Sequence, residues 1–302
     1  MSPPGRPQGG DRSAEPDESA VDILERPLPP TRPVELDDDV GGSVFPGGPS
    51  AQMERMLHDL ARLYQERNDA LAEASRAHYE SVLRLSLAAE FKDDDTGEHV
   101  VRIGFLAERV ATLMGERPGF AKLLRKAAPM HDVGKIGIPD SVLKKPGPLD
   151  PEERQVMNRH AEIGARILGN SRVPLFRMAA DIAGGHHERY DGRGYPRGIA
   201  GHHIPLAARI VAVVDCFDAL LMDRVYRAAM APMPVREMIE AEVGRAFDPR
   251  VAGTVLQHFD ELLALRQRLI LDGLTVAHLI EHVHREPLSR EDLWPAQRAH
   301  WN

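Results

Sequence analysis

Histidines stand on two apolar helix faces of this 302-residue chain. In the stretches 96–114 and 150–168, apolar residues recur at the three- and four-residue intervals of a single helix face. The first face reads His99, Ile103, Leu106, Val110 and Leu113, and the second reads Val156, His160, Ile163 and Ile167. Both histidines are therefore predicted to be buried. One buried histidine is commonly a hydrogen-bonded core residue, but two on separate helices favour a shared function.

The rest of the chain reads as one helix after another. Asp150, Pro151 and Glu153 form a helix start, with an N-cap, a proline at the first helical position and an acid at the third. Gly169 and Asn170 are expected to end that helix. We find no run of alternating apolar and polar residues that predicts strands, and no internal repeat. The predicted fold class is all-α.

Composition divides the chain into four parts. Residues 1–50 contain ten prolines and seven glycines, and ten acidic residues against four arginines. Such a segment buries too little apolar surface to offset its ordering entropy, so disorder is predicted. A long helix without proline or glycine is predicted over 51–92, a helical domain over 88–270, and a further helix with a tail over 271–302.

An apolar seam runs along 53–77 of the long helix, with a charged interruption at Arg67. Its first members follow a heptad-like spacing and are Met53, Met56, Leu60 and Leu63. The seam could join two copies of the chain in a coiled-coil homodimer, or pack on the domain that follows. The sequence leaves both interpretations open.

Charge and hydropathy exclude several function classes. The chain has 38 basic and 46 acidic residues, a net charge of -8, which argues against DNA binding by a strongly basic surface. No apolar stretch reaches the roughly 18 residues that a membrane span needs. The first residues contain no hydrophobic signal segment, and the single cysteine, Cys216, suits a reducing compartment. We therefore expect a cytoplasmic protein without a membrane span.

Three further polar sites lie in apolar or glycine-rich surroundings: His131-Asp132, His186-His187, and Asp215 at the end of an apolar run. Together with the two histidines of the helix faces, these residues are too many to satisfy by ordinary hydrogen bonds. Imidazole and carboxylate ligands without thiolate favour Fe or Mn ions over structural zinc. Two such ions about 3.5–4 Å apart clamp a phosphate and activate a water, so a phosphohydrolase is predicted. Asp218 lies on the same apolar side as Asp215, and spacing alone does not choose between them.

Two segments carry a resemblance to a known family. H-D-V-G-K-I-G-I-P-D at 131–140 resembles the core of the HD superfamily of metal-dependent phosphohydrolases. H-H-E-R-Y-D-G-R-G-Y-P at 186–196 is far more specific and resembles the hallmark of the HD-GYP family, phosphodiesterases for cyclic di-GMP. The resemblance runs from Asp95 to Pro249 and implies an HD-type helical bundle.

The resemblance also implies roles for individual residues. The metal ligands it implies are His99, His131, Asp132, His160, His186, His187 and Asp215. Lys135 joins His131 and Asp132 in the catalytic set, where its ammonium is placed to meet a phosphate oxygen. The remaining substrate-binding residues implied are Gly194, Tyr195, Pro196, Arg224 and Arg227. A guanidinium suits both a phosphate and the edge of a guanine.

The chain departs from the family pattern at Asp95, where family members with three metals have Glu. The shorter Asp side chain retracts the carboxylate by roughly one C–C bond, about 1.5 Å. We therefore expect two tightly held divalent ions and a weak or empty third site. Val225 replaces a proline that is common in the family, and no recognisable sensor domain precedes the domain.

The function implied is hydrolysis of cyclic di-GMP to pGpG, or onward to GMP, in second-messenger signalling. One alternative is an HD phosphohydrolase for another nucleotide. Another is a catalytically weak module that binds a nucleotide or a GGDEF-type cyclase partner. Glu188, next to the histidine doublet, could support a ligand or be exposed, whereas His202 and His203 are expected at the surface.

Overall fold

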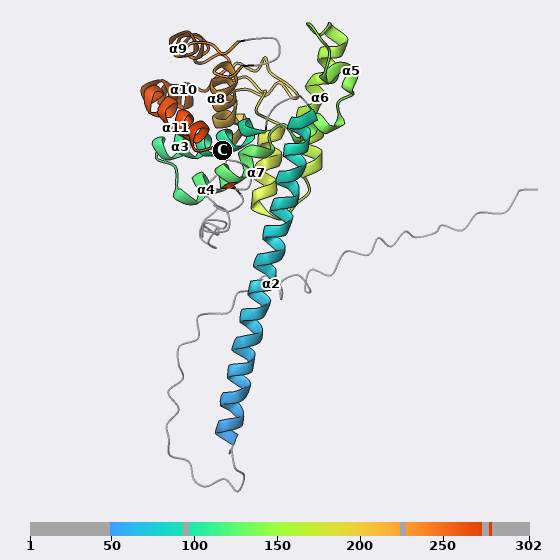
Figure 1. Ribbon diagram of the computed structural model, residues 1–302, viewed down its shortest axis with the longest axis vertical. Helices are drawn as coiled ribbons and strands as arrows, with labels where there is room; N and C mark the ends of the chain where they lie inside the picture. Colours follow the sequence, from blue (N-terminus) through green and yellow to red (C-terminus); the bar gives the residue numbers. More distant parts are fainter. Residues whose placement is uncertain (1–48, 93–96, 224–227, 274–277, 280–302) are drawn as a thin grey trace, which may run out of the picture. The chain divides into compact units, whose positions relative to one another are not determined.

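The computed structural model describes residues 49–92, 97–223, 228–273 and 278–279. These residues form helices and contain no strand, which confirms the all-α prediction (Figure 1). The α-helices are α2 (Pro49–Lys92), α3 (Glu98–Leu113), α4 (Pro118–Ala127), α5 (Asp140–Leu143), α6 (Pro151–Leu168), α7 (Pro174–Ala183), α8 (Leu206–Leu220), α9 (Pro232–Ala241), α10 (Pro249–Gln257) and α11 (Phe259–Leu271). Three short 3-10 helices are η1 (Ala128–Met130), η2 (Val133–Gly137) and η3 (Gly201–His203). Residues 1–48 of the predicted disordered segment and all but a few residues of 271–302 lie outside the described ranges, whereas residues 49 and 50 belong to α2.

The chain divides into two compact units, residues 1–63 and 64–302. The described part of the first unit is the beginning of α2, where the seam residues Met53, Met56, Leu60 and Leu63 are 48–64% exposed. Among the described residues, no helix is both long and apolar enough to cross a membrane.

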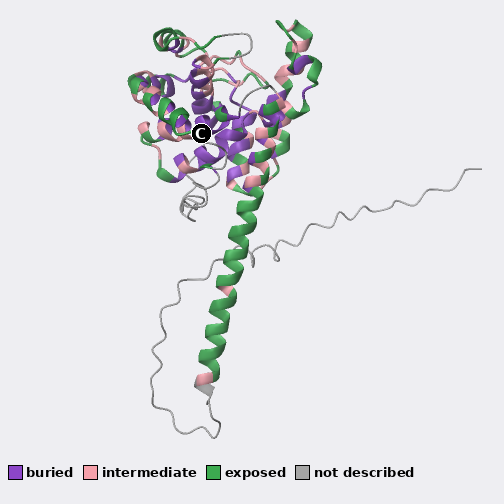
Figure 2. Ribbon diagram, viewed as in Figure 1, coloured by how far each residue is buried: buried purple, intermediate pink, exposed green. Residues whose placement is uncertain are grey.

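The core of the second unit surrounds α3, whose buried face includes Ile103, Leu106 and Val110. The helix packs against α4 and α8, and most of α8 is buried (Figure 2). Tyr79 and Leu83, near the end of α2, belong to the same core. The core therefore includes part of the helix that we expected to precede the domain.

Helix α6 begins and ends as predicted. The Asp150 carboxylate accepts a hydrogen bond from the Glu153 backbone N–H (2.8 Å), and the Glu153 carboxylate accepts one from the Asp150 N–H (2.9 Å). This reciprocal capping box satisfies two donors that a helix start leaves free. The helix ends at Leu168, with Gly169 as its C-cap.

The apolar face predicted for α6 is partly wrong. His160 is buried as expected, but Ile167 is 43% exposed, and the other buried residues are Ala161, Gly164 and Leu168. The reason is that η2 packs on this helix by a close backbone approach. A Cβ added to Gly134 would lie 1.9 Å from the His160 carbonyl oxygen, so only glycine fits there. The small residues of α6 therefore face the core, and the larger Ile167 side chain points away from it.

Candidate metal centre

Five separate elements of the second unit bring the predicted ligands together. His99 lies in the first turn of α3, His131 and Asp132 lie between η1 and η2, and His160 lies in the second half of α6. His186 and His187 follow the end of α7, and Asp215 lies in α8. The seven residues form two groups of side chains, each compact enough to hold one ion.

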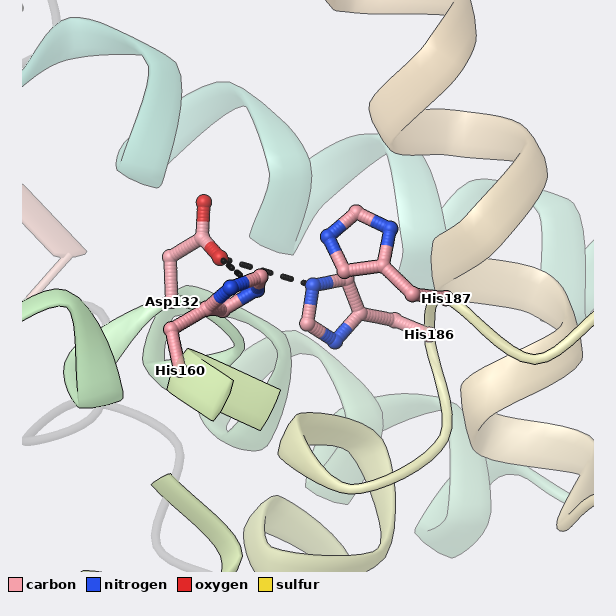
Figure 3. A group of neighbouring side chains, drawn as sticks. All are labelled: Asp132, His160, His186 and His187. Carbon is pink, nitrogen blue, oxygen red and sulfur yellow. Dashed lines mark ion pairs between the residues drawn. The ribbon is translucent and has the colours of Figure 1, made fainter. Parts of the chain in front are cut away.

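The first ligand group consists of Asp132, His160, His186 and His187 (Figure 3). One ligand atom of each lies within 4.8 Å of the others. Asp132 Oδ1 is 3.2 Å from His160 Nε2 and 3.4 Å from His186 Nε2. Figure 3 shows Asp132 and His160 on one side and His186 and His187 on the other, with the Asp132 carboxylate directed toward the His160 and His186 rings.

The second ligand group consists of His99, His131 and Asp215. Asp215 Oδ1 lies 3.1 Å from His99 Nε2 and 3.9 Å from His131 Nε2. Asp132 connects the two groups, because its other oxygen, Oδ2, is 3.3 Å from His131 Nε2. The two oxygens of one carboxylate therefore face different groups, which would allow Asp132 to contact an ion in each.

Hydrogen bonds fix which ring nitrogen of each histidine can bind an ion. The Nδ1 atoms of His131, His160 and His186 donate to the backbone carbonyls of Ala128 (3.1 Å), Met157 (2.8 Å) and Ile182 (3.0 Å). A carbonyl oxygen can only accept, so Nδ1 carries the proton in each neutral ring. The three Nε2 atoms, and Asp132 Oδ1, are buried and make no hydrogen bond. Buried polar atoms without partners are costly, and one cation in each ligand group would satisfy these four.

The charge states of the first ligand group suit a metal. Burial lowers the pKa of His186 and lowers that of His187 well below its usual value, so both rings are neutral near pH 7. The pKa of Asp132 stays well below its usual value, because Lys135 and His131 outweigh the effect of burial. Neutral imidazoles and an ionised carboxylate are the forms that coordinate.

In the absence of an ion, the carboxylates beside the second ligand group favour protonation of its histidines. Burial opposes protonation of His99, but hydrogen bonds to Asp215 and Asp218 outweigh it and raise its pKa to about 10. The pKa of His131 is also raised, because the charge of Asp132 outweighs burial. An ion bound here would displace these protons. The mixture of imidazole and carboxylate donors, with orphaned nitrogen atoms aimed inward, fits two divalent ions.

Asp218 supports a ligand and is itself held by two arginines. Its Oδ2 accepts a hydrogen bond from His99 Nδ1 (2.7 Å), which turns His99 Nε2 toward Asp215. Arg102 Nε and Arg266 Nε donate to its Oδ1 at 2.9 and 2.7 Å. Spacing alone left open which of Asp215 and Asp218 is the ligand, and the resemblance implied Asp215. In the structure Asp215 lies with His99 and His131, whereas Asp218 accepts a hydrogen bond from the far ring nitrogen of His99.

The segment that follows His187 borders the first ligand group. Tyr195 stacks on the His187 ring, with centroids 4.7 Å apart and 27° between the planes. Glu188 is buried, and its carboxylate accepts hydrogen bonds from the backbone N–H groups of Arg197 (2.8 Å) and Ile199 (3.2 Å). Glu188 is therefore not exposed, and its carboxylate holds the loop that follows Tyr195 in the sequence.

Three of the remaining predicted site residues, Gly194, Pro196 and Lys135, lie in the described part of the chain. Gly194 packs so closely that an added Cβ would lie 2.3 Å from the Arg189 backbone nitrogen, and Pro196 is exposed. Lys135 Nζ is 2.8 Å from Asp132 Oδ2. Asp95, Arg224 and Arg227 lie outside the described residues, so their roles stay predictions.

Sequence reasoning missed Glu90 of α2. Its carboxylate lies within 4.8 Å of ligand atoms of His131 and Asp132. The available signal was a carboxylate on the buried side of a helix end, at the spacing of Tyr79, Leu83 and Ser86. That spacing is visible only once the buried side of α2 is known.

Comparison with known families agrees with this site. Residues 55–251 match the family model described as HD domain. The chain belongs to the HD domain family. Within that family it is an HD-GYP protein: it carries the segment H-H-E-R-Y-D-G-R-G-Y-P at 186–196, Tyr195 of that segment stacks on His187, and its relatives include proteins named cyclic di-GMP phosphodiesterases.

Three relatives illustrate the match. The chain is 38% identical over 217 residues to the 3'3'-cGAMP-specific phosphodiesterase 2 of Vibrio cholerae, covering 72% of this chain and 41% of that protein. It is 42% identical over 187 residues to a cyclic di-GMP phosphodiesterase of Thermotoga maritima, covering 61% and 50%. It is 41% identical over 206 residues to the cyclic di-GMP phosphodiesterase response regulator RpfG of Xanthomonas campestris, covering 68% and 54%. The chain spans about half the length of these relatives.

Proposed function

We propose that this chain is a metal-dependent phosphodiesterase that hydrolyses cyclic di-GMP to pGpG, or onward to GMP. One observation carries the proposal: the Asp132 carboxylate lies between two ligand groups that contain buried nitrogen atoms without hydrogen-bond partners. A site with two adjacent cations is suited to a phosphodiester, whose negative charge increases in the transition state.

The exposed fractions of the ligands indicate where a substrate enters. The side chains of His99, His131, His160 and His186 are at most 3% exposed, whereas those of Asp132 and Asp215 are 13% and 22% exposed. Asp132, Asp215 and His187 are therefore the ligands that solvent reaches, and we propose that the substrate approaches from their side. A phosphate that enters there meets the shared carboxylate edge of the two groups.

The chemistry divides between the ions and the chain. Two divalent ions, with Fe or Mn as the proposed identities, would lower the pKa of a water and polarise the phosphoryl oxygens. Lys135 supplies an ammonium beside Asp132, in a position to meet a phosphate oxygen as charge develops on it. Tyr195, stacked on His187, offers a flat apolar face for a base, and burial raises its pKa, so its hydroxyl stays protonated. Arg224 and Arg227 are the proposed partners of phosphate and guanine.

A second candidate substrate is 3'3'-cGAMP. The observation that favours it is the relative from Vibrio cholerae, whose name gives that specificity at 38% identity. The two substrates differ in one base, so base contacts and not the metal centre would separate them.

The substrate proposal is tested with purified protein loaded anaerobically with Fe²⁺ or Mn²⁺. Cyclic di-GMP and 3'3'-cGAMP are supplied separately, and the products are separated by chromatography. We expect a higher kcat/KM on cyclic di-GMP, with pGpG or GMP as product. A higher kcat/KM on 3'3'-cGAMP would replace the first candidate with the second. Absence of turnover in metal-loaded protein would favour a signalling module that binds a nucleotide or a GGDEF-type cyclase.

A further inference from the structure

A buried carboxylate from α2 lies beside the proposed catalytic lysine. Glu90 is in the last turn of α2, 45 residues before Lys135 in sequence, and its side chain is 3% exposed. Its Oε1 makes no hydrogen bond and lies 3.6 Å from Lys135 Nζ. A buried carboxylate without a counter-charge is costly, so the ammonium is the group that compensates it.

The Lys135 ammonium lies between two carboxylates. Its Nζ is 2.8 Å from Asp132 Oδ2 on one side and 3.6 Å from Glu90 Oε1 on the other. The same space could be read as a metal site, because Glu90, His131 and Asp132 are close enough to hold an ion. The ammonium already supplies a positive charge there and would repel a divalent ion, so the geometry favours an ion pair.

A second set of contacts, made by Lys92, holds the end of α2 against the segment that contains Lys135. Lys92 Nζ donates to the backbone carbonyls of Ile136 (3.2 Å) and Ile138 (2.6 Å), and pairs with Asp140 Oδ1 (3.2 Å). These contacts attach α2 to η2 and to the start of α5. They keep Glu90 opposite Lys135, which belongs to η2.

We propose that Glu90 is a positioning residue, which holds the Lys135 ammonium beside Asp132 in the place from which Lys135 meets a phosphate oxygen. The inference rests on the proposed phosphodiester hydrolysis for the role of Lys135, but the ion pair itself does not depend on it. With Glu90 in this role, the end of α2 is part of the proposed active site.

The test is a double-mutant cycle with Glu90→Gln, Lys135→Met and the double variant, each loaded with Mn²⁺. Hydrolysis of bis-p-nitrophenyl phosphate measures the reaction without base contacts. We expect Glu90→Gln to lower kcat about tenfold, with KM and the number of bound ions unchanged. In the Lys135→Met background the same substitution has no further effect on kcat. Glu90→Asp, which keeps the charge, recovers part of the loss, and Glu73→Gln on the exposed side of α2 is the control.

Two results would overturn the inference. Loss of a bound ion in Glu90→Gln would make Glu90 a metal ligand. Equal losses of kcat in both backgrounds would show that Glu90 acts independently of Lys135.

Thermal unfolding of the same four metal-free proteins separates this inference from the proposed function. Glu90→Gln should lower Tm when Lys135 is present and raise it in Lys135→Met, because the second background leaves the Glu90 carboxylate unpaired. A shift of the same sign in both backgrounds would contradict the ion pair. If the wild type hydrolyses no diester, the proposed function fails, and the Tm cycle still decides whether Glu90 and Lys135 are coupled.

Discussion

Asp132 is the residue on which both ligand groups depend. Its Oδ1 faces His160 and His186, and its Oδ2 faces His131 and Lys135. Asp132 belongs to the first ligand group, and its Oδ2 lies 3.3 Å from His131 Nε2 of the second. Its removal should therefore affect two ions at once, whereas removal of one imidazole should weaken one of them.

Asp132→Ala is expected to lower the metal content of the purified protein below one ion per chain. Without both ions, the negative charge that develops on the phosphate in the transition state is no longer stabilised. We therefore expect kcat to decrease by at least about a thousandfold, which corresponds to about 4 kcal/mol. Plasma mass spectrometry counts the ions, and bis-p-nitrophenyl phosphate reports the activity. His202→Ala, at an exposed histidine of η3, is the matched control. Full metal content in Asp132→Ala would show that Asp132 is not a metal ligand.

Asp218 should act on metal binding without touching the metal. Asp218→Asn weakens the hydrogen bond that orients His99, and loss of such a partner typically costs about 10–100-fold in metal affinity. Competition with a chelator should show a lower affinity for one of the two ions and an unchanged affinity for the other. The exposed Asp260→Asn serves as the control. Two unchanged affinities in a folded Asp218→Asn protein would contradict the orienting role.

Among the elements, the loop after His187 is held in part by one buried carboxylate, that of Glu188. Glu188→Ala leaves the N–H groups of Arg197 and Ile199 without their acceptor, at a cost of about 1–3 kcal/mol. We expect a lower Tm and a higher KM for cyclic di-GMP, with the metal content unchanged, because Glu188 belongs to neither ligand group. Glu152→Ala, on the exposed side of α6, controls for the loss of a charge. A decreased metal content would place Glu188 in the centre instead.

The elements also show what the sequence can and cannot predict. Periodicity predicted the burial of His99 and His160 correctly, because each shares a helix face with apolar neighbours. It failed at Ile167, since the approach of η2 to α6 depends on Gly134, which lies in another element. The choice between Asp215 and Asp218 depends on Arg102 and Arg266, which no local spacing brings together.

At the scale of the whole molecule, the seam of α2 remains a proposed dimer interface. Two substitutions, Leu60→Glu and Leu63→Glu, place charges on exposed seam positions. If the seam joins two copies in a coiled coil, the doubly substituted full-length chain should be a monomer by light scattering, while Ala61→Glu, off the seam, stays a dimer. A wild type that is already monomeric, or a double variant that stays dimeric, would contradict this interface.

Five histidines and two aspartates are proposed to hold two divalent ions, which the hydrolysis of cyclic di-GMP requires. The most direct test counts the metal in anaerobically purified wild-type protein and follows turnover of cyclic di-GMP through chelation and reloading with Fe²⁺ or Mn²⁺. We predict two tightly bound ions per chain, with turnover lost on chelation and recovered on reloading. A protein that binds no metal, or one whose turnover survives complete metal removal, would contradict the account.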